Sequence, residues 1–159
     1  LNIKTRTGTL EDNIKVLASD YDAVVSWDVL EHLKDPLAFL TQINSIMKQN
    51  GVFCFSTLDV DNWFPKLMGK HWPWLMDMHL FYFNSNTTEQ FLNKAGFKII
   101  RVERYVHYIS IQYFAEKINA ILPYGLGSPF YFIRKVMPQH LLVPFSFGDI
   151  KLYICVKEY

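Results

Sequence analysis

The segment YDAVVSWDVLEHLKDP, residues 21–36, carries the side chains whose types and spacing best suit chemistry. Its first half is β-branched and apolar, as in a buried strand, and Trp27 and Asp28 follow where that strand ends. Open α/β sheets bind ligands in the crevice beyond the carboxyl ends of their strands. Glu31 and His32 come within the next turn or two, so the sequence predicts a ligand-binding crevice here. The alternative is structural: Asp28 caps the turn, and Glu31 and His32 lie on the surface of a helix start.

A helix follows these side chains, and predicted strands lie on both sides of it. Asp35-Pro36 is a good helix start, and Gly51 would close the helix as a C-terminal cap. Residues 52–57, VFCFST, form a continuous apolar run typical of a strand buried on both faces. The same kinds of pattern predict a strand over 5–9 turning at Gly8, a helix over 10–17 capped by Thr9, a helix over 85–95 ended by Gly96, a strand over 97–105 and a last strand over 150–156.

Strands that alternate with helices of this length predict right-handed β-α-β units and an open, doubly wound α/β sheet. We expect one domain over residues 1–159, because 159 residues with 50% hydrophobic content suffice for one buried core. Residues 106–148 depart from the alternation, with helical spacing over 111–121 and a second helix start at Ser128-Pro129. They are interpreted as a helical insertion or lid within a terminal hairpin whose last strand is antiparallel.

The bulk composition disfavours some partners. Lys and Arg number 16 against 15 Asp and Glu, and the net charge of +1 gives no overall field to attract nucleic acid, so no nucleic-acid partner is expected. Cys54 and Cys155 each lie in an apolar run and are predicted to be buried thiols, which fits a reducing compartment. The sequence shows no basic leader and no run of about 18 apolar residues, so a cytoplasmic chain is expected.

One part of the sequence resembles the fourth motif of class I S-adenosylmethionine-dependent methyltransferases. It runs in the order acidic turn, strand, D-x-x-E-H-x-x-D-P, helix, glycine and strand. It is most similar to the small-molecule type that includes ubiquinone-pathway O-methyltransferases. Downstream, HWPWLMDMHLFYFNSNTTEQFLNKAGF, residues 71–97, looks like the H-x-x-x-F-S/N, helix, A-G-F segment of those enzymes. These motifs cover residues 1 to about 105. The resemblance implies a Rossmann-like fold and methyl transfer from S-adenosyl-L-methionine to a small-molecule acceptor.

The resemblance also assigns cofactor-binding residues. The family holds the adenine near the end of its third strand and the methionyl group near the end of its fourth. Carried over, the adenine side comprises Gly8, Thr9 and Leu10, and the methionyl side comprises Ser26, Trp27 and Asp28.

The family's glycine-rich first turn has no counterpart in this sequence. The one G-x-G, residues 125–127, follows Pro123 rather than a buried strand, so it lacks the context of a nucleotide loop. We therefore expect an N-terminally truncated methyltransferase domain with an incomplete cofactor cradle, which need not turn over by itself. A sheet edge left open where the family's first strands belong would favour a homodimer.

Methyl transfer needs an acceptor held in line with the methyl group and, for a hydroxyl acceptor, a base nearby. His32, His71 and His79 are candidate bases, and His79 is the first choice because its segment closes over the acceptor in the family. Each is alternatively a histidine that only holds a loop in place.

A metal site is another alternative for the same residues. Asp28, Glu31 and His32 at i, i+3 and i+4 would share a helix face, His79 could be a fourth ligand, and some members of the superfamily use Mg²⁺. Because Mg²⁺ prefers oxygen ligands to imidazole, no metal is predicted.

Aromatic residues crowd the segment between the predicted strand at 52–57 and the helix at 85–95. Trp72, Trp74 and Phe81 are predicted to line the pocket of an apolar, aromatic or lipid-like acceptor, and the alternative is a small separate core under a long loop. The insertion at 106–148 has few charges, so packing over the active site, a dimer contact and peripheral membrane contact are all open.

Two other functions remain open. A non-catalytic scaffold or interaction module derived from the same fold would bind neither S-adenosylmethionine nor its demethylated product. A nicotinamide-dependent dehydrogenase shares the doubly wound sheet, but the D-x-x-E-H-x-x-D-P segment argues against it. Serine and cysteine hydrolases are not indicated, because G-x-S-x-G is absent and both cysteines lie in predicted strands.

Overall fold

The computed structural model describes residues 3–112 and 141–158, and the chain divides into two compact units. The first unit comprises the chain up to Tyr105 together with the chain from Gly148 onward, and the second is Val106–Phe147. Every residue that the sequence assigns to the site lies in the first unit.

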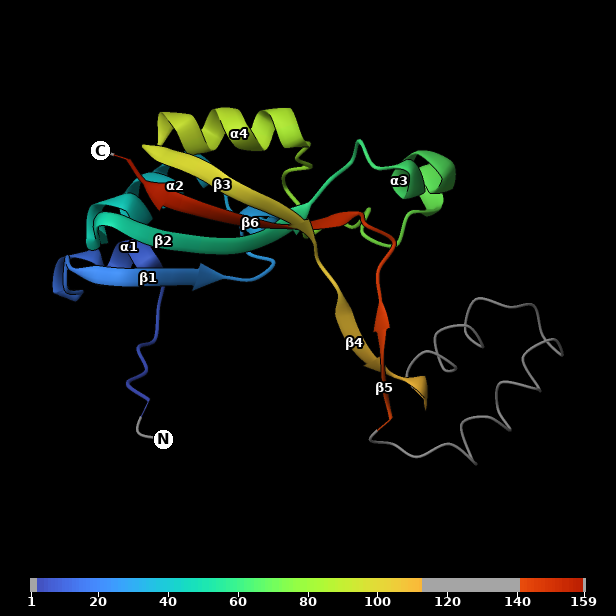
Figure 1. The fold of residues 1–159 in the computed structure, drawn as a ribbon, viewed down its shortest axis with the longest axis horizontal. Coiled ribbons are helices and arrows are strands. Elements are labelled where there is room, and N and C mark those ends of the chain that lie inside the picture. The colour runs from blue at the N-terminus through green and yellow to red at the C-terminus, as the bar shows by residue number, and fades with distance from the viewer. Residues whose placement is uncertain (1–2, 113–140, 159) are drawn as a thin grey trace, which may run out of the picture. The chain divides into compact units, whose positions relative to one another are not determined.

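A four-stranded mixed sheet forms the centre of the first unit (Figure 1). Its strands, in spatial order, are β1 (Tyr21–Ser26), β2 (Met47–Leu58), β6 (Ile150–Lys157) and β3 (Phe97–Arg104). β1 and β2 are parallel, whereas β6 runs antiparallel to both β2 and β3. The predicted α/β class and antiparallel last strand are confirmed, and the carboxyl ends of β1 and β2 meet at one edge of the sheet.

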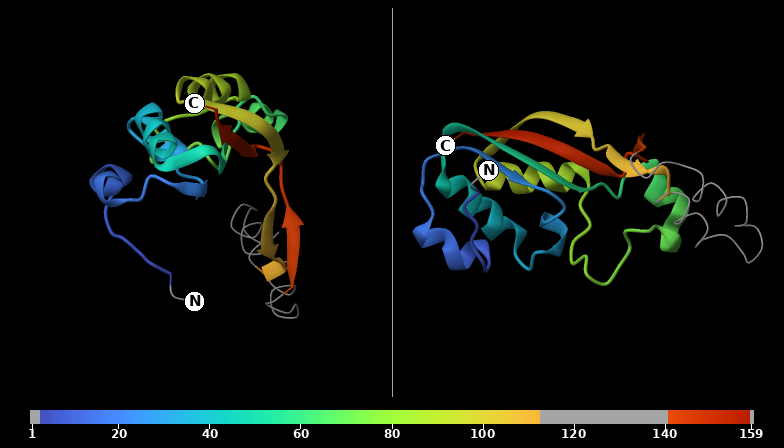
Figure 2. Two further views of the ribbon diagram at one scale, coloured as in Figure 1. Left: turned by 60° about the vertical axis from the view of Figure 1, so that its left-hand side comes forward. Right: turned by 90° about the horizontal axis from the view of Figure 1, so that it is seen from below.

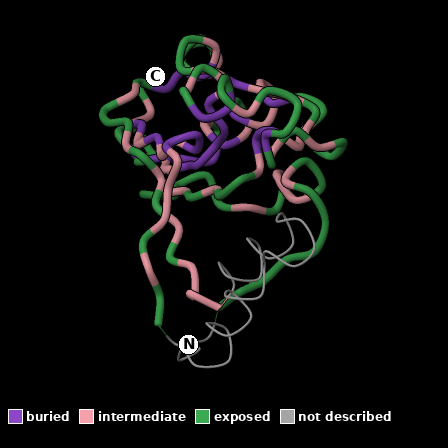
Figure 3. The backbone as a smooth tube through the Cα atoms, turned by 90° about the vertical axis from the view of Figure 1, so that its right-hand side faces the viewer, coloured by how far each residue is buried: buried purple, intermediate pink, exposed green. Residues whose placement is uncertain are grey.

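Helices pack on one face of this sheet. α1 (Leu10–Asn13), α2 (Pro36–Ile46) and α4 (Ser85–Lys94) lie below the strands in the right-hand view of Figure 2. The core between helices and sheet is buried (Figure 3) and includes Leu40, Ile43, Phe53, Phe55, Leu92, Phe97, Tyr153 and Cys155. Because side chains alternate along a strand, the opposite face carries residues that α1, α2 and α4 leave open, and Val25 there is 64% exposed.

The segment before β1 begins with a helix cap. Thr9 and Asp12 form the capping box that starts α1, as the sequence predicts for Thr9. A 3-10 turn, η1 (Ile14–Val16), continues the helix. The predicted strand over 5–9 is wrong, because these residues join no strand and the Asn13 side-chain amide instead binds the carbonyls of Thr7 and Thr9 at 3.0 and 2.9 Å. These bonds fold the segment back onto the start of α1.

α2 begins as predicted, with the Asp35 side chain as its cap, but it ends earlier than the sequence suggests. The helix stops at Ile46, and Gly51 lies inside β2, so the prediction of Gly51 as a helix cap is wrong. A Cβ on Gly51 would lie 2.9 Å from the carbonyl oxygen of Lys48 and 3.2 Å from that of Tyr21. The glycine is therefore favoured because backbone carbonyls of β2 itself and of β1 both come close to this position.

The other predicted elements of the first unit form largely as expected. A capping box between Asn84 and Thr87 starts α4, Gly96 at φ 81° ends it, and β3 follows directly. Both cysteines are free thiols in strands, as predicted, but only Cys155 is buried, whereas Cys54 is half-buried. The connections contain η2 (Leu30–His32), α3 (Trp63–Met68) and η3 (Gly69–His71).

The second unit contains a two-stranded antiparallel ribbon, which the sequence did not predict. β4 (His107–Ser110) pairs with β5 (Leu142–Phe145), with His107 opposite Phe145 and Ser110 opposite Leu142. The predicted helices of the insertion lie largely in 113–140, outside the described residues. In the part of the chain that the structure describes, no helix has the length and apolar content to cross a membrane.

Candidate functional site at the carboxyl edge of the sheet

The first part of the site is the turn that leaves β1. Asp28 has φ 50°, a left-handed conformation that residues other than glycine adopt infrequently and that is enriched at functional turns. Its N–H donates to Ser56 Oγ at 2.9 Å, and the Ser56 hydroxyl donates to Asp28 Oδ1 at 2.6 Å. Ser56 is buried in β2, so these bonds fix the turn to the neighbouring strand. The helical spacing expected for Asp28, Glu31 and His32 is wrong, since only residues 30–32 are helical and they form a single 3-10 turn.

Glu31 lies at the centre of the site and is only 1% exposed. Its carboxylate Oε2 accepts a hydrogen bond from Thr57 Oγ at 3.0 Å. Its backbone carbonyl accepts the N–H groups of Leu80 and Phe81 at 2.8 and 3.1 Å, which fastens the loop between β2 and α4 to η2. Burial raises the pKa of Glu31 above its usual value, because removing a carboxylate from water penalises its charged form.

His32 and His79 face each other beside Glu31, with ring centroids 4.6 Å apart. His32 Nδ1 lies 3.0 Å from the carbonyl oxygen of Met78, and His79 Nδ1 lies 2.7 Å from that of Trp74. A carbonyl oxygen only accepts hydrogen bonds, so each Nδ1 carries the proton and each Nε2 holds the lone pair in the neutral ring. His71, the third candidate base, is exposed at the end of η3 and does not join this pair.

Glu31, His32 and His79 form one donor set. Each offers a ligand atom, and these atoms lie within 4.8 Å of one another. Asp28, which the sequence grouped with them, is engaged with Ser56 instead. The set can accept a proton through Nε2 of a histidine. With two imidazoles and one carboxylate it also has the chemistry of a transition-metal site more than of a Mg²⁺ site.

The three residues of the predicted aromatic wall lie in different surroundings. Trp72 is 5% exposed and its indole N–H donates to Asp149 Oδ2 at 2.8 Å, so its side chain belongs to the protein interior. Phe81 packs against the main core and stacks on Phe83, with ring centroids 5.9 Å apart. Trp74 is half-buried and supplies the carbonyl that binds His79.

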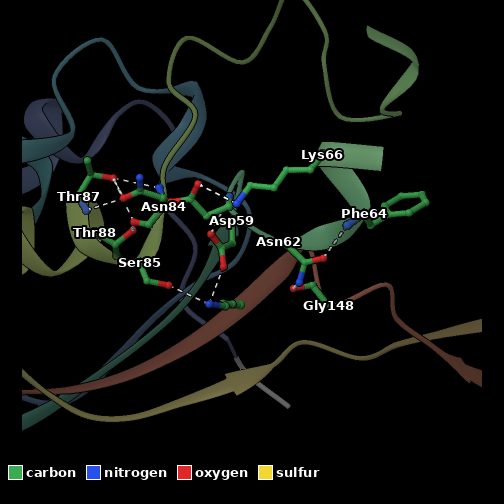
Figure 4. A network of polar contacts seen from close by, with 11 residues as sticks. Asp59, Asn62, Phe64, Lys66, Asn84, Ser85, Thr87, Thr88 and Gly148 are labelled. Atoms are coloured by element: carbon green, nitrogen blue, oxygen red, sulfur yellow. Dashed lines mark hydrogen bonds and ion pairs between the residues drawn. The ribbon is translucent and has the colours of Figure 1, made fainter. Parts of the chain in front are cut away.

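Two buried acidic residues that were not predicted from the sequence, Asp59 (Figure 4) and Asp149, anchor the loop between β2 and α4. Asp59, just after β2, forms an ion pair with Lys151 of β6 at 2.5 Å, and Lys151 also donates to Ser85 Oγ at 2.8 Å. Asp149, just before β6, is only 4% exposed and holds Trp72. Asp149 directly precedes one predicted strand and Asp59 lies two residues after another, and these positions were the signal in the sequence that could have identified them.

The residues assigned to the cofactor lie at the ends of two elements. Ser26 ends β1, and the half-exposed Trp27 ring lies beside Tyr105, with centroids 6.1 Å apart. At the start of α1, the Thr9 side chain is occupied by the capping box and Leu10 packs against the core. An adenine contact at Gly8, Thr9 and Leu10 would therefore use backbone groups.

Curated relatives match only part of this chain. The ubiquinone biosynthesis O-methyltransferase of Cereibacter sphaeroides is 37% identical over 59 residues, which is 37% of this chain and 24% of the relative. The protein of the same name from Dinoroseobacter shibae is 33% identical over 51 residues, 32% of this chain and 21% of its own length. The matches thus span about a quarter or less of those relatives.

Solved structures resemble this chain in fold. A SAM-dependent methyltransferase from Archaeoglobus fulgidus aligns with a TM-score of 0.55 and 15% identity, covering 98% of this chain and 68% of that one. A SAM-dependent methyltransferase from Thermotoga maritima, described as a possible histamine N-methyltransferase, aligns with a TM-score of 0.51 and 14% identity, covering 89% and 58%. At this identity the likeness concerns the fold alone.

A family model described as a methyltransferase domain matches residues 2–102, well over half of the chain. That range contains the Asp28 turn, Glu31 and the facing histidines. The chain therefore belongs to the methyltransferase-domain family and has the class I S-adenosylmethionine-dependent methyltransferase fold.

Proposed function

We propose that the protein transfers a methyl group from S-adenosylmethionine to a hydroxyl oxygen of a small apolar or aromatic molecule. The observation that carries this proposal is the His32–His79 pair at the carboxyl edge of the sheet, with both Nδ1 atoms bound by carbonyls. Such a pair offers a lone pair on Nε2 to an incoming hydroxyl proton. The curated relatives that the chain resembles are named as O-methyltransferases, which supports an oxygen acceptor.

His79 acts as the general base in this proposal, and His32 supports it. The bound cofactor supplies an electrophilic methyl group. Ser26, Trp27 and Asp28 line its methionyl end, and the Asp28 turn is pre-organised by Ser56. Gly8, Thr9 and Leu10 form the adenine side. Of the residues predicted to line the acceptor pocket, Trp74 and Phe81 contact the acceptor in this proposal. Trp72 acts indirectly, because its bond to Asp149 anchors the loop that contains His79.

A metal-assisted form of the reaction is a second candidate, and the Glu31–His32–His79 donor set is the observation that favours it. Metal analysis of the dialysed protein, and methyl transfer before and after treatment with a chelator, separate the two. With His79 as a base, chelation leaves the rate unchanged. Stoichiometric metal and loss of activity on chelation would favour the metal-assisted form.

The first experiment is a calorimetric titration of S-adenosylhomocysteine into this chain and into the full natural protein. Binding by the full protein supports the proposal, and binding by both would show that the residues of this chain suffice for the cofactor. The absence of binding by either would favour a non-catalytic scaffold. A homodimer and peripheral membrane contact through residues 106–148 stay predictions.

The second experiment tests the base directly. Radiolabelled S-adenosylmethionine is supplied to the full protein, once its turnover is established, with a panel of alkyl-substituted catechols as acceptors. His79→Gln is expected to lower kcat by about 100-fold or more, because general base catalysis contributes roughly that much. His71→Gln, at an exposed histidine outside the pair, is the matched control and should leave kcat within twofold. Equal rates for the His79 variant and wild type would remove His79 from the mechanism.

A further inference from the structure

The hydroxyl of Tyr82 lies against the two carbonyls that hold His79. The carbonyl of Met76 accepts the backbone N–H of His79 at 3.1 Å, and the carbonyl of Trp74 accepts the ring Nδ1–H of His79 at 2.7 Å. Tyr82 Oη lies 3.2 Å from the first of these oxygens and 3.5 Å from the second. It also accepts the Met76 N–H at 3.1 Å. One hydroxyl thus closes the short loop that fixes both the backbone and the ring of His79.

The ring of Tyr82 is fixed as well as its hydroxyl. On one side it contacts the His79 ring edge-on, with centroids 6.0 Å apart and planes at 75°. On another side it contacts the Trp72 ring at 6.0 Å. Trp72 in turn is bound by the buried Asp149. A continuous series of contacts therefore runs from Asp149 through Trp72 and Tyr82 to His79.

We propose that Tyr82 is a positioning residue, which locks His79 in the Nδ1–H tautomer and orients its ring toward His32 and Glu31. The importance of this lock for turnover rests on the proposed function of His79 as a base. A hydrogen-bond acceptor at Nδ1 favours the neutral histidine tautomer in which Nε2 is unprotonated. Tyr82 supplies that condition indirectly, by holding the acceptor carbonyl in place.

Tyr82→Phe tests the proposal because it removes the hydroxyl and keeps the ring. The primary readout is the tautomer of His79, observed in the full chain by long-range ¹H–¹⁵N NMR of the histidine side chains and assigned with His79→Gln. Wild type should show the Nδ1–H form, and Tyr82→Phe should show a mixture of both tautomers. Tyr108→Phe is the matched control, because Tyr108 is 69% exposed in β4. It should leave the His79 signals unchanged.

The catechol assay gives the second readout. Loss of a group that orients a catalytic side chain lowers activity by about tenfold or more, so kcat of Tyr82→Phe should fall by about tenfold with KM within twofold. Thermal unfolding checks that the variant is folded. An unchanged His79 tautomer in folded Tyr82→Phe overturns the positioning role, whatever the rate. A shifted tautomer with an unchanged rate supports the positioning role and overturns His79 as the base.

Discussion

Removing the indole N–H of Trp72 should destabilise the chain strongly, because the Trp72–Asp149 hydrogen bond is almost completely buried. Trp72 is 5% and Asp149 4% exposed, and the bond length is 2.8 Å. Trp72→Phe leaves Asp149 Oδ2 without this donor. A hydrogen bond to a charged group contributes roughly 1.5–3 kcal/mol, and the smaller ring adds about 1 kcal/mol for the space it leaves. We expect the free energy of unfolding to fall by about 3 kcal/mol.

Urea unfolding of the full chain measures this change, and a double-mutant cycle isolates the hydrogen bond. Asp149→Asn keeps an acceptor oxygen, so by itself it should cost about half as much as Trp72→Phe. Combined with Trp72→Phe it should cost at least about 1 kcal/mol less than the two single changes added together. Trp27→Phe, at a tryptophan that is 46% exposed, is the control and should change stability by less than about 1 kcal/mol. If Trp72→Phe costs no more than this control, the loop is not anchored through Asp149.

Four further outcomes follow from single contacts. Gly51→Ala should lower the free energy of unfolding by about 2 kcal/mol in urea titrations, because its Cβ would lie 2.9 Å from a backbone carbonyl oxygen. Thr9→Ala removes the α1 capping box and should cost about 1 kcal/mol, with faster amide exchange confined to α1. Ser56→Ala frees the Asp28 turn and should weaken S-adenosylhomocysteine binding by the full protein in calorimetry, with Ser45→Ala on α2 as control. Burial raises the pKa of Cys155 from 9.0 to about 12, so the thiol stabilises the fold below pH 9 and this stability is lost as pH rises from about 9 toward 12. The fall in unfolding free energy over that range should be smaller in Cys155→Ala than in wild type.

Elements whose ends are marked by local side chains could be predicted from the sequence. Asp35 before Pro36, Asn84 before α4 and Gly96 after it are local signals, and the structure places helix boundaries at each of them. Gly51 gave the same kind of signal and misled, because it lies within β2, where its space is limited by the backbone of Lys48 and also by that of Tyr21, a residue 30 positions away. Local patterns do not contain such a contact.

The site was predicted only in part, again because local patterns do not contain contacts between distant residues. The position of Asp28, Glu31 and His32 after a predicted strand located the carboxyl edge, although that strand, β1, is an outer strand with no buried residue rather than the buried strand expected. Their geometry was not predictable, because the left-handed Asp28 turn depends on a hydrogen bond to Ser56, 28 residues later. The approach of His79 to His32 likewise depends on the loop between β2 and α4. This loop is anchored by Asp59, just after β2, and by Asp149, just before β6.

The second unit leaves and rejoins the first at neighbouring points of the sheet. Arg104 is paired with Lys151, and the Tyr105 N–H donates to the Ile150 carbonyl at 3.1 Å. Whatever is inserted between these strands therefore closes a loop whose ends are already held together by sheet pairing, and the entropic cost of closing it grows only slowly with its length. Insertions of different length and sequence can be exchanged at this hairpin with little effect on the folding of the sheet. This position in the chain is therefore suited to evolutionary variation in the inserted unit, while the pairing of β3 with β6 is kept.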